Sequence, residues 1–191
     1  MYNTARNGDS MRELFIAVDV ETTGPIPGKY SMFEIGAVCI DFPEHEFVAQ
    51  LRLTSQAYEP EALRTVNTTI AHLEATGENP QAVMERFAVW VEERRRQYDA
   101  RPVLVAINAP FDWMFISYYF HVFLGHNPFG YSALDLKAYF AGRVGCAWND
   151  ANKKKMEHVY GGALHHTHHA LDDARKVAEL FRFMRHKKIS R

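Results

Sequence analysis

Apolar residues in the first part of the chain come in short runs that are typical of strands. Residues 14–18 (LFIAV) are continuously apolar and rich in β-formers, as expected for a central strand covered on both faces. Two further runs follow at 32–40 and 46–53, and Pro43 with its acidic neighbours marks the turn between them. This pattern predicts a three-stranded antiparallel meander.

Beyond this segment, apolar residues recur at helical spacing, with two more strand patterns between the helices. The helical patterns cover residues 60–73, 80–96, 111–124, 136–142 and 169–185. The strand patterns cover residues 102–107 (PVLVAI) and a short stretch near 131–134. Strands followed by strands that alternate with helices predict an α/β domain, in which helices flank a mixed sheet.

Length and composition fit one globular domain. The chain has 191 residues, of which 47% are hydrophobic and 13% aromatic, which excludes a disordered protein. We expect a single domain over residues 13–188. Residues 1–12 are polar and unpatterned, so we expect a disordered lead-in or a vector remnant there. No apolar run approaches the roughly 20 residues of a membrane helix, so no membrane association is expected.

The cysteines and the net charge give only coarse information about the cellular compartment and the binding partners. Cys39 and Cys146 lie too far apart to suggest a disulfide framework, and they suit a reducing cytoplasm. The formal net charge of −1 lacks the basic excess of many nucleic-acid-binding proteins. It does not exclude an enzyme that holds phosphates partly through metal ions.

Two carboxylates directly follow the most buried predicted strand. Side chains alternate along a strand, so Asp19 and Glu21 project to the same side. If buried, the pair needs a positive partner, because unpaired buried charges are costly. Taken alone, a solvent-exposed Asp-x-Glu turn explains the pair better.

Two further carboxylates interrupt the apolar faces of predicted helices. Asp112 shares a face with Phe115, although a solvated aspartate at a helix start is an equally good interpretation. In the last helix, Asp173 falls within the apolar stripe. The adjacent Asp172 instead points to the polar side together with Lys176. Only one of these two aspartates is therefore expected to face the core.

Taken together, the acidic side chains predict a metal site. Inward-facing carboxylates on separate elements repel one another unless cations lie between them, and oxygen ligands suit Mg²⁺ or Mn²⁺. Two such ions roughly 4 Å apart are a common device for attack on phosphodiesters. His168 stands five residues before Asp173 and fits a general base for the attacking water, although a lone histidine near a helix end is usually structural.

Three motifs follow one another in the expected strand and helix contexts. They are residues 18–24 (VDVETTG) with 33–38 (FEIGAV), 108–112 (NAPFD) and 168–174 (HHALDDA). Together they resemble the DEDDh exonucleases, the superfamily of ribonuclease T, oligoribonuclease and the proofreading subunit of bacterial replicative polymerase. The resemblance covers about residues 14–185, nearly the whole chain.

This resemblance implies a ribonuclease H-like fold with a five-stranded mixed sheet and a 3′→5′ exonuclease activity on DNA or RNA. Asp19, Glu21 and Asp173 would bind the first of two divalent cations. Asp19 would also hold the second, and Asp112 would act there directly or through water. His168 would take the proton of the attacking water, and the products would be nucleoside 5′-monophosphates.

The resemblance also suggests how a single-stranded 3′ end is bound. Backbone groups of Thr22, Thr23 and Gly24 would meet the terminal 3′ hydroxyl, and Asn108 belongs to the same expected site. Phe111 would stack on the last base. A proline-rich loop at 24–31 and a proline before Phe111 depart from many relatives, which leaves DNA or RNA preference and substrate length open. Several relatives dimerise, so a homodimer is a hypothesis by analogy.

Other interpretations of the same residues remain open. The fold could serve as a catalytically silent nucleic-acid-binding or interaction module, as an endonuclease of the ribonuclease H type, or as a small-molecule phosphodiesterase. The histidines at 165–169 (HHTHH) suggest zinc only weakly, because no cysteine pair or second histidine motif supports it. Residues 153–155 (KKK) could contact phosphates beyond the scissile bond, although a solvated helix face is the better interpretation.

Overall fold

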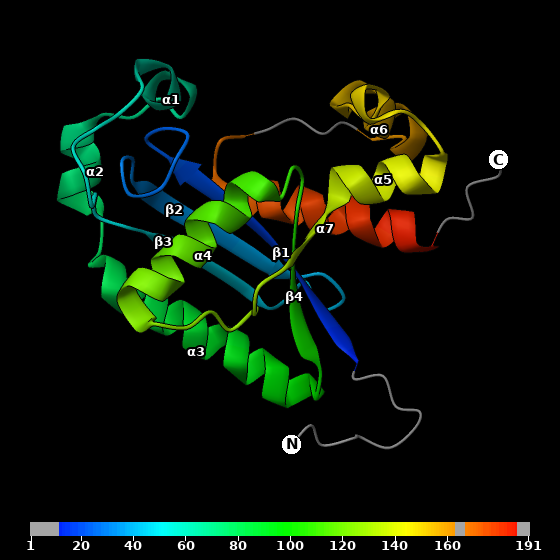
Figure 1. The fold of residues 1–191 in the computed structure, drawn as a ribbon, viewed down its shortest axis with the longest axis horizontal. Coiled ribbons are helices and arrows are strands. Elements are labelled where there is room, and N and C mark those ends of the chain that lie inside the picture. The colour runs from blue at the N-terminus through cyan, green and yellow to red at the C-terminus, as the bar shows by residue number, and fades with distance from the viewer. Residues whose placement is uncertain (1–11, 163–166, 187–191) are drawn as a thin grey trace, which may run out of the picture.

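The computed structural model describes residues 12–162 and 167–186, and a mixed five-stranded sheet forms its centre (Figure 1). In spatial order the strands are β3 (Glu46–Gln50), β2 (Met32–Cys39), β1 (Glu13–Thr22), β4 (Arg101–Ala106) and β5 (Ala133–Asp135). The first three pair antiparallel, whereas β4 runs parallel to β1 and β5 runs parallel to β4. The predicted meander and mixed sheet are therefore present.

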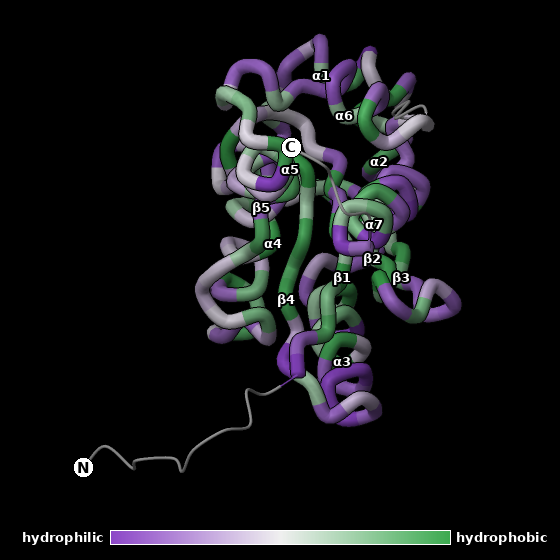
Figure 2. The backbone as a smooth tube through the Cα atoms, turned by 90° about the vertical axis from the view of Figure 1, so that its right-hand side faces the viewer, coloured by the Kyte–Doolittle hydropathy of each residue, from purple (hydrophilic) through white to green (hydrophobic). Residues whose placement is uncertain are grey.

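Helices cover both faces of this sheet, as the two views show (Figures 1 and 2). The helices are α1 (Pro60–Thr65), α2 (Ile70–Thr76), α3 (Pro80–Tyr98), α4 (Pro110–Leu124), α5 (Leu136–Val144), α6 (Lys153–Tyr160) and α7 (Ala170–His186), with a 3₁₀ turn η1 (Trp148–Asp150). One core lies between the sheet and α3 and α4, and a second lies between the sheet and α5, α6 and α7. None of the helices in the described ranges is long and apolar enough to cross a membrane.

The central strand β1 contributes to both cores through its alternating side chains. Ile16 and Val18 pack with α3 and α4, whereas Ala17 packs with α5 and α7. The strand is longer than predicted, so Asp19 and Glu21 lie within it and do not follow it. The antiparallel partner β2 continues alongside them, and a register shift occurs only between Glu21 and Thr22. Both carboxylates consequently share the side of β1 that faces α7.

Two helical predictions differ from the structure. The predicted helix at 60–73 is divided into α1 and α2, because Asn67 has a φ of 50° and Thr69 then caps α2 by accepting a hydrogen bond from the His72 amide. The helical patterns also did not include a range for α6, although its first residues, the lysines at 153–155, were interpreted as a solvated helix face. The predicted lead-in at 1–12 lies, apart from Arg12, outside the described residues, as do residues 187 and 188 of the predicted domain.

Candidate active site

The first pair of carboxylates lies at the end of β1, on the face that α7 covers. Asp19 stands opposite Gly36 of β2, and Glu21 stands opposite Glu34. Burial, followed by the charge of Asp112 and then of Glu21, raises the pKa of Asp19 well above its usual value. Burial, followed by the charge of Glu34 and then of Asp173, raises the pKa of Glu21 to about 8. These shifts show that several acidic groups converge on one poorly solvated place.

Asp112 reaches this place from the first turn of α4. The pairing of β1 with β4 ends at Ala17, so the Val20 amide on that edge is available to a side chain. Asp112 is only 5% exposed, and its Oδ1 accepts this amide hydrogen at 3.2 Å. Burial raises the pKa of Asp112 to about 7, against the opposing effect of its backbone hydrogen bonds. The hydrogen bond ties the start of α4 to β1 at Val20, the residue between Asp19 and Glu21.

Asp173 occupies the first turn of α7 and is 3% exposed, as its place in the apolar stripe predicted. Its Oδ1 accepts hydrogen bonds from the Thr167 amide at 3.0 Å and the Thr167 hydroxyl at 3.2 Å. Its Oδ2 accepts the His168 amide at 3.2 Å. His168 itself has a φ of 58°, in the left-handed region. The carboxylate therefore holds the segment that presents His168.

Within the part of the chain that the structure describes, Glu21, His168 and Asp173 form a group that could hold a metal ion. Each offers one ligand atom, and these atoms lie within 4.8 Å of one another. Asp19 and Asp112 lie near this group, since the charges of Glu21 and Asp173 help to raise the pKa of Asp19, and the charge of Asp112 helps to raise that of Glu21. Oxygen-rich, negatively charged surroundings suit a hard divalent cation. The donor set therefore fits the divalent ions that the sequence suggested.

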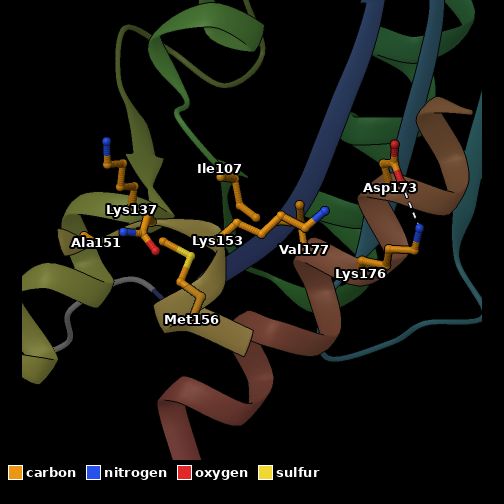
Figure 3. Close-up of a pocket in the computed structure, with 9 residues that line it drawn as sticks. Ile107, Lys137, Ala151, Lys153, Met156, Asp173, Lys176 and Val177 are labelled. Atoms are coloured by element: carbon orange, nitrogen blue, oxygen red, sulfur yellow. Dashed lines mark hydrogen bonds and ion pairs between the residues drawn. The ribbon is translucent and has the colours of Figure 1, made fainter. Parts of the chain in front are cut away.

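Lys176 departs from the prediction that it lies on the polar side of α7 with Asp172. Its Nζ is 3.1 Å from Oδ1 of Asp173 (Figure 3), whereas Asp172 pairs with Arg175 at 2.7 Å. The backbone position does face the polar side, but the long lysine side chain reaches back over one turn of helix. The site thus contains one protein cation among its carboxylates.

The candidate substrate residues mostly support the loop after β1. The Thr23 hydroxyl donates to the Ala57 carbonyl at 2.9 Å, and the Thr23 amide donates to the Ser31 carbonyl at 2.8 Å. The Thr22 hydroxyl donates to the Gly24 carbonyl at 2.9 Å. These bonds fix the backbone shape of the loop, and a role of Thr22, Thr23 and Gly24 in substrate binding stays a prediction.

Asn108 lies in the turn that precedes α4, and Phe111 is the second residue of this helix. Asn108 is exposed, has a φ of 58°, and accepts the Phe111 amide at its carbonyl. Phe111 is partly buried, with its ring centroid 5.4 Å from that of Phe115. Contact of either residue with a nucleotide stays a prediction. Of the histidines that weakly suggested zinc, His165 and His166 lie outside the described residues.

Glu34 belongs to the motif at residues 33–38, but the sequence assigned it no role. The structure places it beside the site. It is 7% exposed, and its Oε1 accepts the Ala170 amide at 3.0 Å, at the first residue of α7. Burial raises its pKa, and its charge contributes to the raised pKa of Glu21. A single carboxylate in an otherwise apolar strand was the available signal in the sequence.

Gly36 allows α7 to approach β2 at the same point. A Cβ at Gly36 would lie 2.2 Å from the Ala170 carbonyl carbon and 2.2 Å from the Leu171 amide nitrogen. Gly36→Ala is therefore expected to lower the free energy of unfolding by about 3 kcal/mol, because backbone atoms cannot move aside as a side chain can. Urea denaturation of both proteins measures this difference.

Gly142→Ala in α5 is the matched control for Gly36→Ala. A Cβ at Gly142 meets nothing within 4 Å, and alanine is the better helix former, so stability is expected to rise by about 0.5–1 kcal/mol. Equal and small effects of the two substitutions would show that α7 does not need this close approach.

Comparisons with known proteins bear on both fold and chemistry. An exonuclease family model of the ribonuclease T type matches residues 16–181. The chain is 41% identical over 174 residues to the 3′-5′ DNA exonuclease Cap18 of Escherichia coli, which covers 91% of this chain and 92% of that protein. This match spans all three motifs.

Solved structures share the fold at low sequence identity. The nuclease domain of 3′hExo, a DEDDh family member bound to rAMP, superposes with a TM-score of 0.73 at 12% identity, covering 96% of this chain and 98% of that one. Escherichia coli Exonuclease I in complex with a dT13 oligonucleotide gives a TM-score of 0.70 at 16% identity over 93% of this chain. The chain spans only 42% of Exonuclease I. The predicted five-stranded, ribonuclease H-like fold is confirmed.

Proposed function

The chain belongs to the ribonuclease T type of exonuclease family, and from this premise we propose that it is a two-metal 3′→5′ exonuclease acting on single-stranded DNA. The observation that carries the proposal is the convergence of Asp19, Glu21, Asp112 and Asp173 with His168 at one end of β1. DNA is preferred to RNA in this proposal because the relative at 41% identity is named a DNA exonuclease.

The carboxylates provide the ligands for the cations in this scheme. Glu21 and Asp173 would hold one ion together with Asp19, and Asp19 with Asp112 would hold the other. When bound, the two divalent cations supply Lewis-acid activation of the attacking water and stabilisation of the departing 3′ oxygen. The raised pKa values of Glu21 and Asp112 support this proposal, since such groups ionise most readily when a cation compensates their charge.

His168 acts as the general base for the attacking water. Its imidazole offers a nitrogen within 4.8 Å of a carboxylate oxygen of Glu21 and of Asp173, which supports this role, because a general base must lie close to the water that it deprotonates. The bond from the His168 amide to Asp173 fixes its backbone, while the side chain remains partly exposed and can pass the proton to solvent. The products are a nucleoside 5′-monophosphate and a strand shortened by one residue.

The direct test uses 5′-labelled single-stranded DNA and RNA oligomers of identical sequence with Mg²⁺, with Mn²⁺ or with EDTA. A ladder that shortens from the 3′ end and disappears in EDTA is the expected result, with DNA degraded faster than RNA. Fragments from the middle of the strand would instead indicate an endonuclease. Bound but intact oligomers would indicate a catalytically silent binding module.

His168→Asn tests the role of the general base. Asparagine tolerates the φ of 58° at this position, so the segment is expected to keep its shape. We expect kcat to fall about a hundredfold with little change in oligomer binding, because the proton acceptor is lost. Single-turnover kinetics across a pH series measures this.

His169→Asn is the matched control, because the neighbouring side chain is exposed. It is expected to keep kcat within about twofold of the wild type. Equal losses in the two variants would point to a disturbed loop and would remove His168 from the role of base.

Two broader properties follow as proposals. We place the enzyme in the cytoplasm, on the strength of two free and widely separated cysteines, Cys39 and Cys146. Self-association stays a prediction by analogy with dimeric relatives, and size-exclusion chromatography with light scattering tests it.

A further inference from the structure

A cavity adjoins the carboxylate cluster beyond Asp173, between α5, α6 and α7 (Figure 3). Its volume is about 180 Å³. Its floor is apolar and buried, formed by Ala151, Met156 and Val177 with the partly buried Ile107. Its polar lining is Lys137, Asn152, Lys153, Asp173 and Lys176. Apolar walls with a few polar groups at the edge are typical of small-ligand subsites.

The charge of this lining is positive, although the chain as a whole carries a formal charge of −1. Three lysines face a single carboxylate, that of Asp173. Lys176 already contacts Asp173, and Lys137 stacks on the Trp148 ring at 4.2 Å from its centroid. Lys153 instead extends from α6 across the cavity towards Val177 (Figure 3). The Lys153 ammonium group is thus available to contact an anion in the cavity.

The N-terminus of α6 reinforces this preference for an anion. Asn152 caps the helix by accepting the Lys155 amide at 3.0 Å, and Asn152 and Lys153 both line the cavity. The first turn of a helix carries a partial positive charge and amide donors. The cavity therefore combines an apolar floor with a cationic edge. This combination matches a nucleotide, because the faces of the base and sugar are apolar and the phosphate is anionic.

The position of the cavity identifies which nucleotide fits. An exonuclease that works from the 3′ end releases the terminal nucleotide with the scissile phosphate attached, and that phosphate lies at the carboxylate cluster. Every other phosphate of the strand lies on the 5′ side of the scissile bond. A phosphate held in a cationic cavity that borders Asp173 but extends away from it therefore belongs to the retained strand.

We propose that this cavity is a subsite for the nucleotide on the 5′ side of the scissile phosphate, with Lys153 as the ligand of its phosphate. The inference rests on the proposed exonuclease function and extends it to substrate length. Lys153 binds the retained strand and does not touch the reacting atoms, so it contributes to affinity. A dinucleotide without a 5′ phosphate has no phosphate other than the scissile one, so it cannot make this contact.

Equilibrium binding tests the subsite without requiring cleavage. Fluorescence anisotropy with a 5′-labelled single-stranded DNA 12-mer is measured with Ca²⁺ in place of Mg²⁺, over a series of salt concentrations. Lys153→Ala is expected to weaken binding roughly tenfold and to lower the salt slope by about 0.7, the value for one phosphate contact. Lys154→Ala is the matched control, because this exposed neighbour lines a different surface beside Asp150 and His158. It is expected to change binding less than twofold.

A series of oligomers with one neutral methylphosphonate linkage identifies the phosphate. Placing the linkage next to the scissile one on its 5′ side is expected to raise KM in the wild type and to add nothing in Lys153→Ala. The subsite would be overturned if Lys153→Ala and Lys154→Ala bound the strand equally well. It would also be overturned if a neutral linkage raised KM in Lys153→Ala as much as in the wild type, whatever its position. A wild type that binds strands through Lys153 but cleaves none would contradict the exonuclease function and leave the subsite in place.

Discussion

Asp173→Asn is expected to lower kcat/KM for single-stranded DNA about a thousandfold, because an amide cannot neutralise a divalent cation. Asparagine keeps the size of the side chain, so the apolar stripe of α7 is expected to pack as before. Its single amide oxygen can replace either Oδ1, which accepts the Thr167 amide, or Oδ2, which accepts the His168 amide, so one of these two hydrogen bonds is lost. Steady-state kinetics with a 5′-labelled oligomer in Mn²⁺ measures the loss.

The adjacent Asp172→Asn provides a control within the same helical turn. The side chain of Asp172 is 44% exposed and pairs with Arg175 on the surface, whereas that of Asp173 is 4% exposed. Exposed ion pairs contribute little to stability, so activity within about twofold of the wild type is expected. Similar activities of the two variants would mean that Asp173 is not part of the catalytic group.

The sequence could predict those parts of the site that depend on local geometry. The alternation of side chains along β1 puts Asp19 and Glu21 on one side, whichever strands surround them. The helical period separates Asp173 from Asp172 for the same reason, because 100° per residue is a property of the helix itself. The fold class also followed, since strand and helix patterns alternate along the chain in the order that a mixed sheet requires.

Contacts between distant segments could not be predicted in this way. The bond between Asp112 and the Val20 amide depends on where the pairing of β4 with β1 ends, and neither segment alone fixes that point. The contact of Glu34 with Ala170 joins residues 136 positions apart. Such details depend on the packed positions of whole elements, which residue patterns describe only coarsely.

Long side chains were a second source of error. The helical position of Lys176 points towards solvent, so the pattern grouped it with Asp172. Its four-carbon stem nevertheless lets the ammonium group return to Asp173. An ion pair with a buried carboxylate stabilises the lysine side chain more than full exposure to water does. This explains why the Lys176 side chain turns towards Asp173.

The electrostatics of the site predict how stability changes with pH when no metal is bound. Glu21 has its pKa raised from 4.5 to about 8, and Asp112 from 3.8 to about 7. Between the usual and the raised values, the folded protein binds more protons than the unfolded chain, so stability falls as pH rises. In EDTA we therefore expect the full stability below about pH 4.5 and a progressive loss up to about pH 8. The shift of Glu21 alone corresponds to a loss on the order of 5 kcal/mol, roughly 10–20 °C in melting temperature.

Divalent cations should remove this loss, because they bind the ionised carboxylates and bind only the folded state. At a concentration a hundred times the Kd, one site adds about 2.7 kcal/mol of stability. The gain grows with pH, since deprotonation of Glu21 and Asp112 no longer costs free energy once a cation compensates their charge.

Differential scanning calorimetry from pH 5 to pH 8.5, in EDTA and in Mn²⁺, gives both curves. Glu21→Gln should make the EDTA curve less steep, because a neutral amide has no proton to lose and only the share of Asp112 remains. A melting temperature in EDTA that rises with pH over this interval would mean that the carboxylates are compensated by the protein itself, and that the cluster does not need a metal ion.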